Sequence, residues 1–105
     1  IPEINDISKN FIEKIYQQII NYNNNFKFTL FRDTIYDIFI YDININDFIW
    51  KLNEKLISNN FIKDKDVNQL LIETYNFYQL YNNNYRAIYH VENYLLKIIK
   101  LIHSD

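Results

Sequence analysis

The chain has 105 residues, a net charge of −2, and neither cysteine nor glycine. The lack of cysteine excludes disulfides and thiolate-held zinc, and the lack of glycine excludes the glycine-rich loops that bind phosphate groups. The slightly acidic charge provides no overall field that favours nucleic acid or an anionic membrane. No apolar run approaches the ~18 residues needed to span a bilayer, so we expect no membrane partner.

The chain opens Ile1-Pro2-Glu3 and contains no methionine. A chain of this length is the size of one domain. We therefore expect residues 1–105 to form a single domain cut from a longer protein.

Asparagine clusters divide the chain into five segments. Asparagine tolerates a positive φ better than most residues and bonds to its own backbone, so it can end helices and form turns where glycine is absent. The clusters lie at 21–25, 42–46, 58–60 and 81–84.

The first two segments have mainly helical periodicity. The first predicts a helix with Asp6 as its N-cap. Its apolar stripe consists of Ile7, Phe11, Ile12, Ile15, Tyr16, Ile19 and Ile20. The second segment, from about 26 to 40, aligns Leu30, Phe31, Ile35, Ile38 and Phe39. Its IYDIFIY run is rich in β-formers, so a strand is the alternative there.

The last three segments also predict helices. The third begins at Asn46 or Asp47 and aligns Phe48, Ile49, Leu52, Leu56 and Ile57. The fourth aligns Val67, Leu70, Leu71, Thr74, Tyr75, Tyr78 and Tyr81. The fifth aligns Ile88, Val91, Leu95, Ile98, Ile99 and Ile102. Five helices with short connections predict an all-α bundle.

The fourth and fifth helices carry apolar residues beyond one stripe. These residues are Ile72, Phe77, Leu80, Tyr85, Tyr89 and Leu96. A helix that is apolar beyond one stripe is either central in its domain or also covered by a partner. Both a crowded core with some exposed aromatics and a contact with a partner protein remain open.

Neither histidine indicates a catalytic or metal site. His90 and Glu92 are two residues apart, so they point about 200° apart on a helix and cannot both bind one metal. His103, Ser104 and Asp105 are adjacent in sequence, whereas a catalytic triad is held from separate elements. Asp64 and Asp66 precede the fourth helix, whose positive N-terminus explains them. We predict no catalytic residue, no metal and no cofactor in this segment, and therefore no enzyme activity of its own.

One polar stripe and one carboxylate remain on the fifth helix. The stripe consists of Arg86, His90, Asn93, Lys97 and Lys100. It could follow a phosphate backbone, but because the domain is slightly acidic we favour a solvated face. Glu92 lies beside the apolar stripe of this helix, and a partly buried carboxylate needs a partner. The partner could be a lysine or arginine from another helix or another chain, or the side chain could reach water at the edge of the core.

The run RAIYHVENYLLKIIKL at 86–101 resembles the last helix of the small subunits of replication factor C, the eukaryotic clamp loader, and most closely the subunit 3 family. That family carries a similar Lys-Ala-Ile-Tyr-His-Leu-Glu-Ala-Phe pattern. Residues 87–90 and Glu92 match it, Val91 stands for leucine and Tyr94 for phenylalanine. Residues 1–3 resemble the family's entry into this domain, and FTLFRDTIYDIF at 28–39 is similar to its second helix.

The resemblance implies a C-terminal collar domain of a DNA-dependent AAA+ ATPase in the nucleus. Five such domains hold the clamp-loader pentamer together, and the complex loads PCNA onto primer–template DNA in replication and repair. The motifs that bind ATP and Mg²⁺ would then lie upstream of this segment. Its partners would be the other replication factor C subunits, with PCNA and DNA contacted through the whole complex.

The resemblance also suggests which residues contact a neighbouring subunit. We hypothesise that Tyr85, Tyr89 and Leu96 form this interface, with Glu92 paired across it. Two alternatives are an unrelated helical protein-interaction module and a small helical DNA-binding domain that uses Arg86, Lys97 and Lys100.

Overall fold

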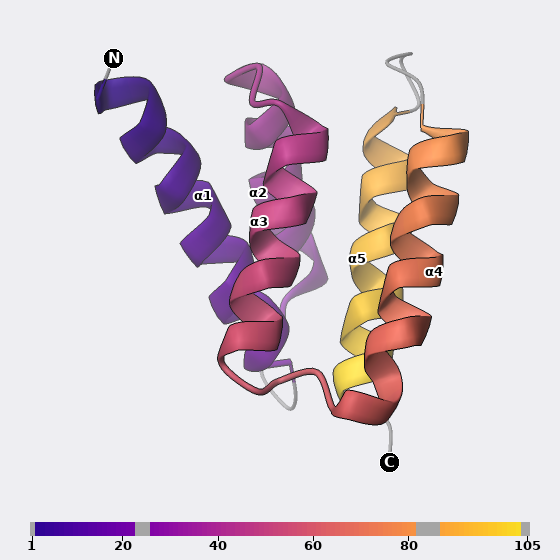
Figure 1. Ribbon diagram of the computed structural model, residues 1–105. Helices are drawn as coiled ribbons and strands as arrows, with labels where there is room; N and C mark the ends of the chain where they lie inside the picture. Colours follow the sequence, from indigo (N-terminus) through magenta and orange to yellow (C-terminus); the bar gives the residue numbers. More distant parts are fainter. Residues whose placement is uncertain (1, 23–25, 82–86, 104–105) are drawn as a thin grey trace.

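The computed structural model describes residues 2–22, 26–81 and 87–103 (Figure 1). Over these ranges the chain forms helices and no strand. The helices are α1 (Pro2–Ile20), α2 (Phe28–Ile40), α3 (Ile45–Ser58), α4 (Asp64–Leu80) and α5 (Ala87–His103). The predicted all-α bundle of five helices is confirmed, and the strand alternative for the second segment is wrong.

The helices run alternately down and up (Figure 1), and their contacts close a ring. Around this ring the order is α1, α2, α5, α4, α3, and each helix packs against the next. α1 also contacts α5 across the middle of the bundle. α4 lies at one side of the molecule, where it packs only against α3 and α5 among the described helices, so much of its surface faces outward.

One stripe from each helix fills a single core. Ile15, Phe31, Leu52, Leu70 and Leu95 have no exposed surface, and each comes from a different helix. Burying a side chain of this size contributes about 1.5–3 kcal/mol, so the helices are held mainly by this packing.

Two turns show how the chain manages without glycine. Asp42 (φ 54°) and Asn60 (φ 64°) both adopt the left-handed conformation that usually favours glycine. Each lies in one of the predicted breaks, after α2 and α3 respectively. The helix α3 begins at Ile45, slightly earlier than predicted, because the Asn44 side chain accepts a hydrogen bond from the Asp47 N–H at 2.9 Å.

Two predicted details of the first two helices are wrong. Asp6 is not an N-cap, because α1 already begins at Pro2, where the fixed φ of proline suits a first helical turn. Leu30 is exposed rather than buried, and Thr34 occupies the core face of α2 in its place. The threonine hydroxyl donates to the Leu30 carbonyl at 3.0 Å, so its burial leaves no unpaired donor.

The core face of α4 also differs from the predicted one. Leu70, Thr74 and Phe77 face the core, whereas Leu71 and Tyr75 face outward. Apolar residues occur on most sides of this helix, so periodicity alone does not select a face. The face that is buried is the one that α3 and α5 cover.

Candidate protein-interaction surface

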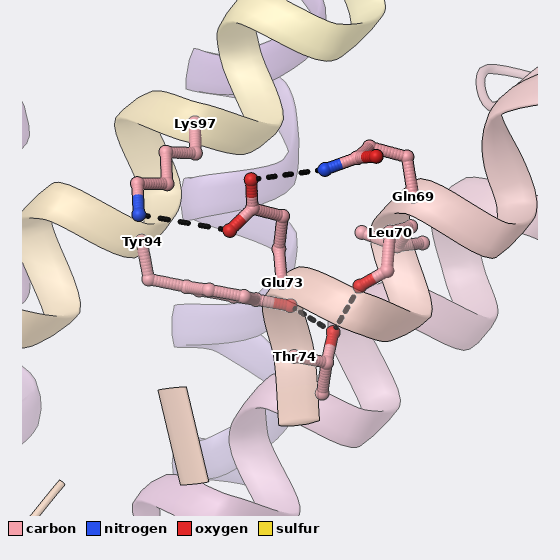
Figure 2. A network of polar contacts seen from close by, with 6 residues as sticks. All are labelled: Gln69, Leu70, Glu73, Thr74, Tyr94 and Lys97. Carbon is pink, nitrogen blue, oxygen red and sulfur yellow. Dashed lines mark hydrogen bonds and ion pairs between the residues drawn. The ribbon is translucent and has the colours of Figure 1, made fainter. Parts of the chain in front are cut away.

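A buried polar network fixes α4 and α5 relative to α3. The Tyr94 hydroxyl lies 2.7 Å from Thr74 Oγ1, and Asn53 Nδ2 lies 3.0 Å from each of these two oxygens. Thr74 donates its own proton to the Leu70 carbonyl at 2.8 Å, so Tyr94 donates to Thr74 (Figure 2). Because each polar group is paired, the network selects one arrangement of the three helices.

Burial raises the pKa of the Tyr94 hydroxyl to about 12, and its hydrogen bonds with Thr74 and Asn53 offset part of that rise. The hydroxyl is therefore protonated at neutral pH and acts as a donor inside the bundle. Its role is to hold α4 and α5 in register, which determines the shape of the surface that these helices present.

Glu92 finds its partner within the chain. Arg32 Nε lies 2.6 Å from Glu92 Oε2, and Arg32 Nη2 lies 3.0 Å from Oε1. Glu92 is only 7% exposed, whereas half of the Arg32 side chain is exposed and its guanidinium lies 5.2 Å above the Phe28 ring. Of the alternatives for Glu92, the structure shows an arginine of another helix, so the hypothesis that Glu92 pairs across a subunit boundary is replaced by this α2–α5 pair.

The residues predicted for the interface have different environments. Tyr89 is 60% exposed on the outward side of α5. Leu96 is partly buried against the core, so only part of its side chain is available to a partner. Tyr85 lies outside the described residues, as does Arg86 of the basic stripe.

Two of the basic-stripe residues differ in their pairing. Lys97 Nζ lies 3.6 Å from the Glu73 carboxylate, which also accepts from Gln69 at 3.2 Å (Figure 2). Lys100 is exposed, and no ion pair joins it to a charged group within the described ranges. Only Lys100 thus presents an uncompensated cation on this part of α5.

The contribution of α2 to this surface was not predicted from the sequence. Tyr36 is 58% exposed and lies one turn after Arg32. Since α2 and α5 are antiparallel (Figure 1), Tyr36 and Tyr89 lie on the same side of the Arg32–Glu92 pair. The sequence does contain a signal for Tyr36, because this aromatic residue lies outside the apolar stripe of α2. Tyr89 was identified by the same kind of position on α5.

A second apolar region lies on α3 and α4. Trp50, Leu71, Ile72 and Tyr75 are all exposed. The hydrogen bond from Asn53 to Thr74 and that from the Tyr78 hydroxyl to the Asn46 carbonyl join these two helices. Trp50 was not identified from the sequence as a surface residue.

His103 has a structural contact. Its Nε2 lies 2.8 Å from the Ile19 carbonyl, which can only accept, so the histidine donates. This bond fastens the end of α5 to the end of α1. Within the described ranges no group of three or more His, Asp or Glu side chains could hold a metal ion. No described helix is both long and apolar enough to cross a membrane.

Protein-family profiles, curated proteins and solved structures contain no match to this chain.

Proposed function

We propose that this chain is a helical subunit-assembly domain whose α2 and α5 contact a neighbouring subunit. The observation that carries the proposal is the exposed aromatic pair Tyr36 and Tyr89 beside the Arg32–Glu92 pair. Exposed tyrosine next to arginine is typical of the residues that contribute most to protein–protein binding. A surface that only faces solvent has no need for an exposed tyrosine at either position.

The Arg32–Glu92 pair supports this surface in two ways. It joins the two helices that carry the tyrosines, so both are held at fixed positions before a partner binds. The Arg32 side chain also remains half exposed while its guanidinium forms its hydrogen bonds within the chain. A pre-organised surface loses less conformational freedom on association.

The particular assembly that we propose is the collar of the replication factor C clamp loader. Support comes from the resemblance of residues 87–94 to the last helix of its small subunits. In this proposal the chain binds other subunits and has no catalytic role itself. ATP, Mg²⁺, PCNA and primer–template DNA act through the rest of a nuclear complex.

Native mass spectrometry tests this proposal. The chain is co-purified with the collar domains of the other four replication factor C subunits. We expect a stoichiometric mixed complex that Tyr36→Ala/Tyr89→Ala weakens, whereas Tyr75→Ala, an equally exposed tyrosine on α4, leaves it intact.

Three results would count against it. A chain that stays alone with the collar domains and also with full-length subunits overturns the clamp-loader assignment. A mixed complex that the double variant does not weaken places the interface elsewhere. Steeply salt-dependent DNA binding by the chain alone, lost on charge reversal of Lys97 and Lys100, supports the DNA-binding alternative.

A further inference from the structure

Lys100 stands on a ridge between two apolar hollows at the C-terminal end of α5. One hollow, of about 210 Å³, lies between α4 and α5 and has Leu70, Ile98 and Leu101 in its lining. The other, of about 370 Å³, lies on the opposite side of α5 and includes Leu96 and Ile99. Lys100 borders both hollows, and we call this feature the Lys100 ridge.

The ridge carries an uncompensated positive charge. Lys97 and Glu73, which also line the first hollow, already form an ion pair with each other. Near the second, His103 Nε2 is bonded to the Ile19 carbonyl. Lys100 has no ion-pair partner within the described ranges. The ridge therefore suits a segment that carries a carboxylate between two apolar side chains.

The outward face of α2 carries such a segment. Leu30, Asp33, Asp37 and Ile40 follow one another at intervals of three and four residues, so they share one side of the helix, and we call them the α2 stripe. Leu30 and Ile40 are exposed large apolar residues. The two carboxylates between them form no ion pair within the described ranges.

The dimensions of the ridge and the stripe agree. The two hollows lie on opposite sides of one helix, whose diameter with side chains is ~10–12 Å. Leu30 and Ile40 are ten residues apart, which is ~15 Å along α2. A helix that crosses α5 at Lys100 can thus place one apolar side chain in each hollow and its carboxylates at the ammonium group.

We propose that the α2 stripe of a second copy of this chain docks across the Lys100 ridge. The stripe and the ridge are different surfaces, so the contact is head-to-tail: each copy offers an acidic stripe to one neighbour and a basic ridge to the other. The proposal does not rest on the clamp-loader assignment, because it concerns only contacts between copies of this chain.

Sedimentation equilibrium over a range of concentrations tests the contact. We expect reversible self-association that weakens as salt is raised. Lys100→Glu alone, and Asp33→Lys/Asp37→Lys alone, should each raise the dissociation constant about tenfold, since each replaces attraction by repulsion. Lys9→Glu and Glu54→Lys reverse exposed charges on α1 and α3, and should change nothing.

Mixing the two variants tests the head-to-tail geometry. The Lys100→Glu chain keeps a native stripe, and the Asp33→Lys/Asp37→Lys chain keeps a native ridge. One native contact can therefore form between them, and the reversed contact also joins opposite charges, so we expect a mixed complex from two chains that hardly self-associate. Its formation also shows that both variants are folded.

Several outcomes overturn the proposal. One is a chain that stays monomeric up to about 1 mM, where even a contact of ~4 kcal/mol would be half formed. Another is self-association that either charge reversal leaves unchanged, as expected if the Trp50 and Tyr75 region makes the contact. A third is a mixture of the two variants that yields no complex.

Discussion

Arg32 in α2 binds Glu92 in α5 through two hydrogen bonds, of 2.6 and 3.0 Å, across 60 residues of sequence. The hydrogen bond to this carboxylate is the main reason why the pKa of Arg32 is raised above its ordinary value. Glu92 is buried and Arg32 is not, so the carboxylate depends on the arginine more than the arginine depends on the carboxylate.

This dependence predicts the effect of removing either partner. Arg32→Ala leaves a buried carboxylate without a cation, and we expect the melting temperature to fall by several degrees. Glu92→Gln introduces no buried charge, so its effect should be smaller. The variant Arg32→Ala/Glu92→Gln should be more stable than Arg32→Ala alone, and the four proteins form a double-mutant cycle readable by calorimetry.

Arg32→Lys is the matched control for this cycle. It keeps the positive charge but cannot form the two-pronged bond, so its melting temperature should lie between those of the wild type and Arg32→Ala. If Arg32→Ala melts at the wild-type temperature, the pair does not stabilise the contact between α2 and α5.

The five helices were predictable because their signals are local. Each helix has apolar residues with a period of 3.6, and each break between helices contains asparagine. In one of these breaks Asn60 adopts the left-handed conformation itself. The orientation of α4 was not predictable from the same signals. Phe77 and Tyr75 are both aromatic, and only the positions of α3 and α5 decide that Phe77 is buried.

The candidate surface was predictable only on α5. The exposure of Tyr89 follows from its place beyond the apolar stripe, whereas the Arg32–Glu92 pair joins two helices whose neighbourhood the sequence does not reveal. This neighbourhood follows from the order of the helices around the ring, in which α2 packs against α5 although α3 and α4 lie between them in sequence. Contacts of this kind depend on topology rather than on local pattern.

A second prediction concerns the N-terminus of α3. Asn44 caps this helix by accepting from the Asp47 N–H, so Asn44→Ala should lower the free energy of unfolding by ~1 kcal/mol. Asn44→Ser keeps a capping oxygen and should lose less. Asn46→Ala is the control, since Asn46 lies in the same first turn and its side chain makes no hydrogen bond within the described ranges. A larger loss for Asn46→Ala than for Asn44→Ala would contradict the capping role.

A third prediction tests the network of Asn53, Thr74 and Tyr94. Tyr94→Phe removes the hydroxyl that donates to Thr74 and accepts from Asn53 Nδ2, so two buried hydrogen bonds are lost. We expect the free energy of unfolding to fall by ~1–3 kcal/mol, measured by urea denaturation. Tyr16→Phe is the control, because Tyr16 is also buried but its hydroxyl makes no hydrogen bond within the described ranges. Equal losses in the two variants would show that the network adds nothing beyond packing.

The last prediction concerns alkaline pH. The pKa of Tyr94 is about 12 in the folded chain, against an ordinary value of 10, so between these values the folded state binds more protons than the unfolded state. The stabilisation is therefore complete below pH 10 and is lost as the pH rises toward 12. The difference between the two pKa values corresponds to a loss of roughly 2–3 kcal/mol in the free energy of unfolding.

Urea denaturation at several pH values between 9 and 12 measures this loss in the wild type and in Tyr94→Phe. Burial also raises the pKa of Tyr78 and Tyr81, so both proteins should lose some stability over this range. The wild type should nevertheless lose more, and the two curves should converge as the pH approaches 12, because the wild type gives up a stabilisation that the phenylalanine variant never had. Parallel curves would mean that Tyr94 ionises near its ordinary pKa, and that its hydroxyl reaches water rather than the interior of the bundle.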